Sequence, residues 1–448
     1  MQSGGPNDFA FCILHFAFGG HAVKVIPRID RFDATVTVPP SKSYSVRALL
    51  LAAMADGTTT ITNCLDSDDT RYAYEALRAI GFEVGGSFAK ALTIGPRTHM
   101  SANDVTLFIG NAGTAMRFLT GWLAFTPGRF LIDGEERMRS RPIGDLVDAL
   151  LQLGAEVEYA EREGYPPLRI RGKKMRGGFE VSVSADTSSQ FASALMMGGA
   201  TLPGGITVVL EKLASAPYLD ITADALISFG ARVERNGNRI HVSARSLKCD
   251  EYRVEGDYSS ASYWFAAAAA TKGIARVRGL ASPTAQGDAG FVDILSRMGC
   301  KVTVNADEIS LEGPEQLIGG TFDCVDTPDI VPSLAAIAPL ASSPVEIVNI
   351  ANLRVKESDR IATVTSELRR LGAKVEERPD GMLIQPGWSG ETAVIETHND
   401  HRIAMAFAVA GLARGNVTIG DERVVSKSYP RFWRTLDEAI ESSRPANE

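Results

Sequence analysis

Five basic residues of this chain stand at or close to the expected starts of helices: Lys42, Arg137, Lys356, Arg402 and Lys427. The N-terminal end of a helix carries a partial positive charge, so a cation there is unfavourable unless an anion lies beside it. The free backbone N–H groups of the first turn also bind anions. This placement therefore predicts a site for small anionic molecules.

Two carboxylates accompany these cations. Asp329 begins an otherwise apolar helical segment, and Glu357 stands between Lys356 and Arg360. Among cations a carboxylate is usually ionised and structural. Placed across a bound substrate, the two could instead transfer protons at a hydroxyl group and at a carbon atom. The pattern alone leaves both interpretations open.

Other polar residues at helix starts have a simpler explanation. Ser, Thr and Asp are ordinary N-caps, and this interpretation is favoured for Thr70, Asp257 and Thr327. Arg117 could be a cation on a helix surface, and Asp359 could simply orient a neighbouring arginine. These residues therefore do not by themselves indicate a ligand.

The elements that must position the site are visible as a repeat. A short sequence phrase occurs five times: an amphipathic run leads to a glycine, and a valine follows three residues after it. The glycines are Gly81, Gly154, Gly230, Gly299 and Gly372. A glycine after an amphipathic run predicts a helix, a left-handed residue that ends it, and then a strand. Because the chain of 448 residues holds about six such periods, we expect six versions of one small α/β unit.

A second repeat alternates along the chain with the glycine phrases. Nearly all-apolar helical segments, each followed by a strand-like segment, recur six times, from Leu49, Trp122, Ala194, Trp264, Leu334 and Ala406. Helices that are apolar on all faces belong inside a domain, whereas the helices before the glycines carry charge on one face and belong outside. The sixth outer helix is expected over residues 432–440, and its missing strand could come from residues 36–38.

Composition limits the possible classes of protein. Hydrophobic residues make up 45% of the chain, which is enough for large cores and for two domains. A net charge of −8 argues against a nucleic-acid surface and against attraction to anionic membranes. No apolar stretch free of polar interruption is long enough to span a membrane. Residues 1–24 are interpreted as a flexible extension rather than a signal peptide.

The five cysteines suggest neither a metal site nor a disulfide framework. They are scattered, without CxxC spacing or histidine partners, at Cys12, Cys64, Cys249, Cys300 and Cys324. We therefore expect no metal and a reducing, cytoplasmic setting.

Five longer motifs match one known family. They are PPSKSYSVRALLLAA from Pro39, GNAGTAMR from Gly110, ERMRSRPIGDLVDAL from Glu136, LRVKESDRIA from Leu353 and NDHRIAMAF from Asn399. From about residue 36 to residue 436 the chain resembles 5-enolpyruvylshikimate-3-phosphate synthase. This resemblance implies transfer of the enolpyruvyl group of phosphoenolpyruvate to the 5-hydroxyl of shikimate 3-phosphate, by a monomer and without a metal or organic cofactor.

The resemblance also implies a fold. It is a two-domain inside-out α/β barrel of six βαβαββ repeats, three in each domain. One domain would span residues 41–254 and the other would join residues 25–40 to 255–448. The active site would lie in the cleft between them, and closure would bring helix starts around the anions and exclude water.

Site residues follow from the same resemblance. The ligands of shikimate 3-phosphate would be Lys42, Ser43, Arg47, Ser188, Ser189, Gln190, Ser215, Tyr218, Asp329, Asn352 and Lys356. Those of phosphoenolpyruvate would be Lys42, Gly113, Arg137, Gln190, Glu357, Arg360, His401, Arg402 and Lys427. Asp329 would take the proton of the 5-hydroxyl and Glu357 would protonate the methylene carbon, with help from Lys42 or His401.

One position departs from the family pattern. Members commonly carry proline after the NAGTAMR stretch, whereas this chain has Phe118. A bulky side chain there could shift Gly113 or Thr114. We hypothesise an altered sensitivity to glyphosate, which in this family occupies the phosphoenolpyruvate site.

Two alternatives remain. The sister enolpyruvyl transferase that acts on UDP-N-acetylglucosamine typically has a cysteine in the loop before its Arg-Pro, and residues 136–142 contain none. The run from Ser188 to Gln190 also favours shikimate 3-phosphate. A non-catalytic repeat scaffold would need a basic groove or a large apolar face, which the negative charge disfavours.

Overall fold

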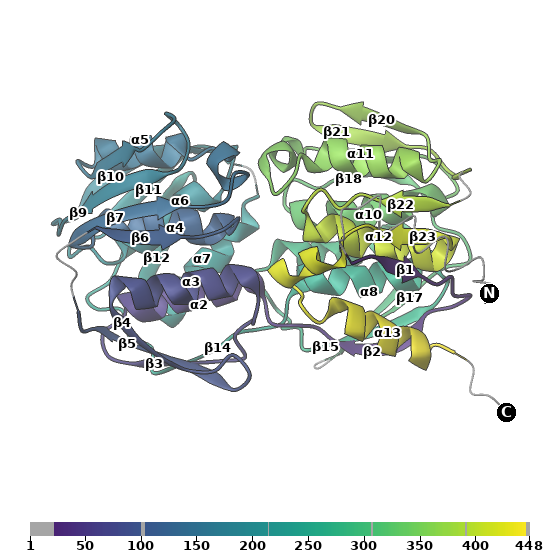
Figure 1. Cartoon of the computed structure of the whole chain (residues 1–448), viewed down its shortest axis with the longest axis horizontal. Helices are drawn as coiled ribbons and strands as arrows, with labels where there is room; N and C mark the ends of the chain where they lie inside the picture. Colours follow the sequence, from purple (N-terminus) through teal and green to yellow (C-terminus); the bar gives the residue numbers. More distant parts are fainter. Residues whose placement is uncertain (1–21, 100–103, 214, 306–307, 390–391, 445–448) are drawn as a thin grey trace, which may run out of the picture. The chain divides into compact units, whose positions relative to one another are not determined.

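The computed structural model describes residues 22–99, 104–213, 215–305, 308–389 and 392–444. The chain divides into two compact units (Figure 1). The central unit comprises Pro39–Asp257 and Ala281–Gly287, and the terminal unit comprises Met1–Val38, Tyr258–Leu280 and Asp288–Glu448. Most of the predicted extension over residues 1–24, with Cys12, lies outside the described residues.

Three four-stranded sheets build the central unit. Their strand orders are β14-β3-β5-β4, β6-β7-β9-β8 and β10-β11-β13-β12. In each sheet the first two strands are parallel and the other pairs are antiparallel. The strands are β3 (Thr59–Thr62), β4 (Phe82–Gly86), β5 (Ala91–Arg97), β6 (Val105–Phe108), β7 (Gly128–Asp133), β8 (Glu156–Tyr159), β9 (Leu168–Gly172), β10 (Phe179–Ala185), β11 (Ile206–Leu213), β12 (Arg232–Asn236), β13 (Arg239–Ser243) and β14 (Glu251–Arg253).

The terminal unit repeats this arrangement. Its sheets have the orders β2-β15-β17-β16, β18-β19-β21-β20 and β22-β23-β1, the last with three strands. The strands are β1 (Lys24–Ile26), β2 (Asp33–Thr37), β15 (Ile274–Arg278), β16 (Lys301–Val304), β17 (Glu308–Glu312), β18 (Gly320–Asp323), β19 (Val345–Val348), β20 (Val375–Arg378), β21 (Gly381–Ile384), β22 (Ala393–Ile395) and β23 (Val417–Ile419).

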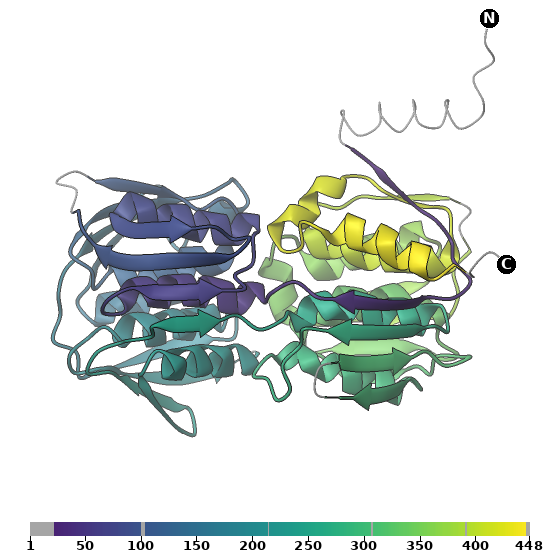
Figure 2. The same cartoon turned by 90° about the horizontal axis from the view of Figure 1, so that it is seen from below.

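The strand that completes the last sheet comes from the start of the chain, but the predicted segment was wrong. Lys24–Ile26 pairs antiparallel with β23. The segment around Val36 instead belongs to β2, which pairs in parallel with β15 (Figure 2). Ala34 and Val36 alternate with exposed residues along β2 and are buried, so this strand has its own place in the core. One terminal segment therefore supplies strands to two sheets.

Apolar helices fill the interior of each unit. The inner helices are α2 (Lys42–Met54), α4 (Gly113–Leu123) and α6 (Gln190–Gly199) in the central unit, and α8 (Tyr258–Ala270), α10 (Val331–Ile337) and α12 (His401–Arg414) in the terminal unit. Every residue from Tyr44 to Ala53 of α2 is buried. The inner helices α8, α10 and α12 contact one another, and each unit has its own hydrophobic core.

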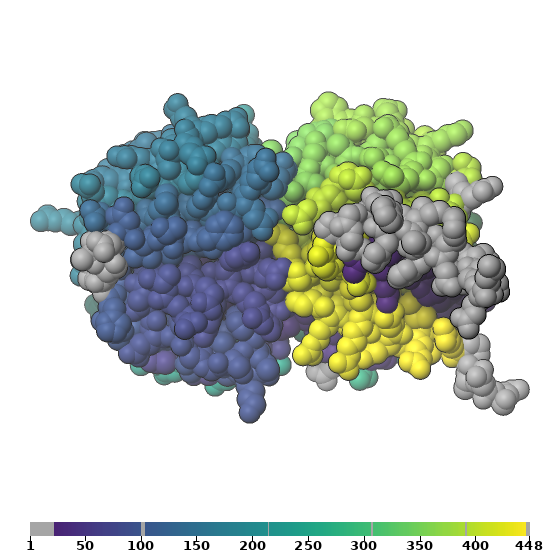
Figure 3. Space-filling model, in the orientation of Figure 1, coloured from purple at the N-terminus to yellow at the C-terminus, as the bar shows by residue number. Residues whose placement is uncertain are grey.

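Amphipathic helices pack beside the inner helices, as the glycine phrases predict. They are α3 (Asp68–Ile80), α5 (Gly144–Gln152), α7 (Pro217–Ser228), α9 (Phe291–Arg297), α11 (Arg360–Arg370) and α13 (Phe432–Ser442). For example, α3 packs against α2 and α7 against α6, and each of these outer helices leaves one face exposed. The C-terminal residues, yellow in Figure 3, form part of the surface of the terminal unit.

All five repeated glycines have positive φ, between 80° and 102°, within two residues of the end of an outer helix. At Gly81 a Cβ atom would lie 2.3 Å from the carbonyl oxygen of His99, so both the backbone conformation and the space require glycine.

Within the described ranges, no helix combines the length and the apolar character needed to cross a membrane.

Candidate active site

The buried guanidinium of Arg360, at the start of α11, is the centre of a charged cluster in the terminal unit. Its Nη1 donates to Asp329 Oδ1 at 2.8 Å, its Nη2 to Glu357 Oε2 at 2.9 Å, and its Nε to Asp400 Oδ2 at 2.8 Å. Burial on its own lowers the pKa of Arg360, but the three carboxylates outweigh it and hold this pKa above its ordinary value. The group is therefore a permanent cation that orients three acids.

A second arginine shares one of these acids. Nη2 of Arg402, in the first turn of α12, donates to Asp329 Oδ2 at 2.7 Å. Its Nη1 lies 3.4 Å from the hydroxyl of Tyr263, whose pKa burial raises to about 12 although Arg402 opposes the shift. Asp329, in the short helix η3 (Pro328–Ile330), thus places one oxygen on each of two arginines. Its position and orientation are fixed by charge-assisted hydrogen bonds.

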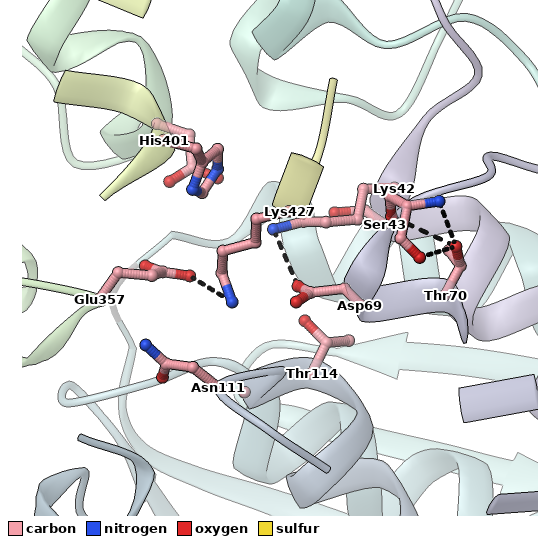
Figure 4. A network of polar contacts seen from close by, with 12 residues as sticks. Lys42, Ser43, Asp69, Thr70, Asn111, Thr114, Glu357, His401 and Lys427 are labelled. Carbon is pink, nitrogen blue, oxygen red and sulfur yellow. Dashed lines mark hydrogen bonds and ion pairs between the residues drawn. The ribbon is translucent and has the colours of Figure 1, made fainter. Parts of the chain in front are cut away.

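Glu357 lies between two cations. One oxygen accepts from Arg360, and the other lies 3.9 Å from Nζ of Lys427, which ends the short helix η6 (Glu422–Lys427). Figure 4 shows the ion pair between Glu357 and Lys427. Both side chains are buried, so the protein shields this pair from solvent screening.

His401 and Asp400 stand at the start of α12. The ring of His401 is fully buried, with Nδ1 3.6 Å from Asp400 Oδ1. Asp400 is the N-cap: its side chain accepts from the backbone N–H of Arg402 at 3.0 Å, and it also accepts from the hydroxyl of Ser358 at 3.0 Å. A single buried carboxylate therefore joins the start of α12 to Arg360.

The remaining predicted residues of this unit lie on one short segment. Asn352 lies in the short helix η5 (Ala351–Val355) and is buried, and Lys356 follows directly and is half-buried. This segment also carries Glu357, so all three precede α11.

In the central unit, Lys42 is the first residue of α2. Its Nζ lies 3.4 Å from Oδ2 of Asp69, a buried residue in the first turn of α3 (Figure 4). The N-cap Ser41 accepts from the backbone N–H of Tyr44. Carboxylates of the protein lie beside three of the five predicted cations, with Asp69 beside Lys42, Asp329 beside Arg402 and Glu357 beside Lys427. The binding of a small anion by these cations stays a prediction.

Arg47, one turn further along α2, is a buried cation with neutral partners. Its Nε donates to Thr222 Oγ1 at 2.9 Å, and its two terminal nitrogens donate to the carbonyl oxygens of Ser43 and Tyr218 at 3.0 and 3.1 Å. Among its partners in the described parts of the chain there is no carboxylate. Burial lowers the pKa of Arg47 to about 10. An anionic ligand would supply the missing counter-charge.

Two further arginines surround the glycine that begins α4. Arg117 donates to the carbonyl oxygens of Gly113 at 3.2 Å and of Pro142 at 2.9 Å, and Arg141 donates to Asn111 Oδ1 at 3.0 Å. A Cβ atom at Gly113 would lie 2.6 Å from Nη2 of Arg141 and 2.7 Å from Nη1 of Arg117. The interpretation of Arg117 as a surface cation is wrong, since it is buried in this turn.

Arg137 stands in the loop after β7, just before the short helix η1 (Met138–Ser140). The loop is fastened by Arg139, whose Nε donates to Asp133 Oδ1 at 2.9 Å and whose Nη1 donates to Glu161 at 3.0 Å. These ion pairs hold the loop that carries Arg137 and so give this residue a defined place.

The other predicted residues of the central unit lie at the starts of α6 and α7. Gln190 Nε2 donates to Thr114 Oγ1 of α4 at 3.2 Å, and the backbone N–H of Gln190 donates to Ser188 Oγ at 3.3 Å. Ser189 is the N-cap of α6. Ser215 has a φ of 61° just before α7, which carries Tyr218 in its first turn.

Comparison with known proteins identifies the family of the chain. The family model described as EPSP synthase (3-phosphoshikimate 1-carboxyvinyltransferase) matches residues 26–436. The chain belongs to the EPSP synthase family.

Relatives match over most of their length. The chain is 43% identical over 417 residues to a 3-phosphoshikimate 1-carboxyvinyltransferase of Tolumonas auensis, covering 90% of this chain and 96% of that protein. It is 42% identical over 410 residues to a protein of the same name from Methanoculleus marisnigri, with the same coverage.

Solved structures show the same fold. The EPSP synthase of Acinetobacter baumannii aligns with a TM-score of 0.78 at 28% identity, over 93% of this chain and 98% of that one. The enolpyruvyl transferase NikO of Streptomyces tendae aligns with a TM-score of 0.73 at 19% identity, over 93% and 96%. At that identity the likeness concerns the fold alone.

Two acidic residues of this EPSP synthase family member were not predicted as part of the site. Asp400 and Asp69 occur in first turns or caps, where aspartate is common for structural reasons, so their types and positions gave no separate signal. Only the distances to Arg360 and Lys42 reveal what these carboxylates do.

Proposed function

We propose that the two polar clusters together carry out the family reaction. As an EPSP synthase family member, the chain is a transferase, a 3-phosphoshikimate 1-carboxyvinyltransferase, whose substrates are phosphoenolpyruvate and shikimate 3-phosphate. Its reaction belongs to the shikimate pathway of aromatic amino-acid biosynthesis. The observation that best supports the site is the ion-paired set of the buried Arg360, Arg402, Lys427 and Glu357 with the half-buried Asp329.

Phosphoenolpyruvate is a small molecule with a carboxylate and a phosphate, and planar guanidinium groups bind both in two-point fashion. We assign its binding to Lys42, Gly113, Arg137, Gln190, Glu357, Arg360, His401, Arg402 and Lys427. To bind it, Arg360 and Arg402 must share their N–H donors between the ligand and Asp329.

Shikimate 3-phosphate adds a ring, hydroxyl groups and its own anionic groups. We assign its binding to Lys42, Ser43, Arg47, Ser188, Ser189, Gln190, Ser215, Tyr218, Asp329, Asn352 and Lys356. The neutral surroundings of Arg47 support this assignment, because this buried cation has no carboxylate partner among the described residues.

The proposed proton transfers use the two acids of the charged cluster. Asp329 takes the proton of the 5-hydroxyl as that oxygen attacks C2 of phosphoenolpyruvate, while Glu357 gives a proton to the methylene carbon. The product of this step is a tetrahedral intermediate. Loss of phosphate and of a proton from the new methyl group then restores the double bond. Lys42 and His401 are further candidates for moving these protons.

We also propose that the six sheets with their helices are copies of one βαβαββ repeat, three in each of two domains of an inside-out α/β barrel. The common strand order of the sheets supports this. A monomeric state and inhibition by glyphosate are further proposals. Gel filtration tests the first, and comparing glyphosate inhibition of the parent and Phe118→Pro tests the role of Phe118 in the second.

A substrate comparison tests the function. Phosphate release from phosphoenolpyruvate should require shikimate 3-phosphate and should not occur with UDP-N-acetylglucosamine. Release with the nucleotide sugar alone would favour the sister transferase, and release with neither would favour a scaffold. The Asp329→Asn variant should bind both substrates but turn over about a hundredfold more slowly or worse. Near-normal turnover would remove Asp329 from the mechanism.

A further inference from the structure

Phe118 lies against Arg47, one of the buried cations of the central unit. Its ring belongs to α4 and is fully buried, and the guanidinium carbon of Arg47, from α2, lies 4.8 Å from the ring centroid. A cation within about 6 Å over an aromatic face is attracted by the ring quadrupole, and more strongly when both groups are shielded from water. Arg47 is itself only 1% exposed.

The ring complements the hydrogen bonds of Arg47. Those bonds lie in the plane of the guanidinium, to Thr222, Ser43 and Tyr218, and they use three of its five N–H groups. The guanidinium carbon lies over the ring of Phe118, so the ring limits how far the guanidinium can move. Two N–H groups remain for a ligand, and their direction depends on the position of the guanidinium.

The ring also favours the charged state of Arg47. Burial lowers the pKa of Arg47 to about 10, and none of its partners in the described ranges is a carboxylate. The negative face of an aromatic ring partly replaces the lost hydration of the cation. An aliphatic side chain or a proline at this position has no such face.

We propose that Phe118 is a positioning residue that acts through Arg47 on the binding of shikimate 3-phosphate. The inference rests on the proposed function, in which Arg47 binds an anionic group of that substrate. It places the main effect of residue 118 on the shikimate side, whereas the sequence hypothesis placed it on Gly113, Thr114 and the phosphoenolpyruvate side.

Removing the ring tests this role. The variants Phe118→Leu and Phe118→Met both keep an apolar side chain without an aromatic face, and the two replacements have similar volumes. We expect the KM for shikimate 3-phosphate to rise about five- to tenfold in both. The kcat and the KM for phosphoenolpyruvate should stay unchanged, because Arg47, through which Phe118 acts, is assigned to shikimate 3-phosphate alone.

A matched control separates positioning from stability. Phe130, on β7 of the same unit, is also a buried ring. Phe130→Leu should lower the melting temperature as Phe118→Leu does, yet leave both KM values unchanged. A double-mutant cycle with Arg47→Gln tests the route: if Phe118 acts through Arg47, then Phe118→Leu has no further effect on the KM for shikimate 3-phosphate in the Arg47→Gln background.

The outcomes distinguish this inference from the proposed function. If the parent releases no phosphate with shikimate 3-phosphate, the proposed function fails. If the parent is active, three results would overturn the role of Phe118. These are an unchanged KM for shikimate 3-phosphate in both ring-less variants, an equal rise in the KM for both substrates, and a full effect of Phe118→Leu in the Arg47→Gln background.

Discussion

Asp400 illustrates how one side chain can set the geometry of several others. It caps α12, accepts from Nε of Arg360 and from the backbone of Arg402, and is fully buried. Aspartate and asparagine are equally good N-caps. The substitution Asp400→Asn therefore keeps the cap and removes only the charge.

We expect Asp400→Asn to lower the free energy of unfolding by about 3 kcal/mol or more, because it leaves part of the charge of Arg360 uncompensated in a buried place. The KM for phosphoenolpyruvate should also rise, since Arg360 loses one of its three carboxylate partners. Urea unfolding and steady-state kinetics measure the two effects.

Asp421→Asn is the matched control for this variant. Asp421 also caps a helix, η6, and accepts from the backbone N–H of Arg423, but the side chain of Arg423 that it pairs with is exposed. Loss of such an exposed pair changes stability by about 1 kcal/mol or less. Equal effects of the two substitutions would show that capping, and not the buried charge, makes Asp400 important.

At the scale of elements, the ends of the outer helices were predictable and the paths of the first strands were not. Gly154 and its four counterparts predict a left-handed residue at the end of each helix, because the positive φ needed there is a local requirement that glycine meets. The pairing of Lys24–Ile26 with β23 joins residues almost the whole chain apart. Short strands of this kind carry no pattern that specifies a partner, so β1 and β2 could not be distinguished.

Two of these glycines form a natural test of the repeat. Gly154 has a φ of 80°, and among the described residues no atom lies within 4 Å of the position that a Cβ atom would take. Gly81 has a φ of 102° and a carbonyl oxygen 2.3 Å from the Cβ position. Gly154→Ala should therefore cost about 1–2 kcal/mol of stability from backbone strain alone. Gly81→Ala should cost more, because the backbone of His99 must also move.

Both glycine variants should keep the kinetic constants of the parent, because the repeated glycines follow the C-terminal ends of the outer helices and the site residues stand at helix starts. Urea unfolding and steady-state assays measure this. A loss of activity from Gly154→Ala without loss of stability would contradict the assignment of that end to structure.

The loop before α12 is held by a hydrogen bond between His398 and Glu367 whose strength depends on pH. Nε2 of His398 lies 3.2 Å from Oε1 of the buried Glu367, whose other oxygen pairs with Arg370 at 3.0 Å and accepts from the backbone of Glu396. The hydrogen bond to Glu367 raises the pKa of His398, and burial opposes it. A raised pKa means that the folded protein binds the proton more tightly than the unfolded chain.

The contribution of this contact is thus fully present below the pKa of an unfolded histidine, about 6.5, and is lost as the pH rises through the higher folded value. Because His398 is partly exposed, we expect it to be less than about 1 kcal/mol. His398→Gln should remove this part of the pH dependence of the urea midpoint. His241→Gln, in the central unit, should leave it unchanged; the same loss there would contradict the role of His398.

At the scale of the whole molecule, the two units differ in whether their cores come from one continuous stretch of the chain or from several. The central core is built almost entirely from side chains between Tyr44 and Val254, one continuous stretch. The terminal core combines side chains from Ile26 to Val38 with others up to Ile440. Periodicity predicted six units, and the resemblance to the family separately predicted how they divide into two domains. A repeat alone does not indicate where the chain leaves one core and enters the next.

This difference predicts that the fragment of residues 39–257 folds by itself. It contains all three sheets of the central unit, including β14, and nearly all of its buried side chains. A core of this size supports independent folding. We expect a single cooperative urea transition by circular dichroism and no release of phosphate, since the fragment lacks Asp329, Glu357 and Arg360.

A fragment of residues 258–448 is the matched comparison. Without β1 and β2 it leaves β23 and β15 unpaired on one side, so it should unfold without a cooperative transition. Cooperative folding of this second fragment would show that the strands from the start of the chain are dispensable.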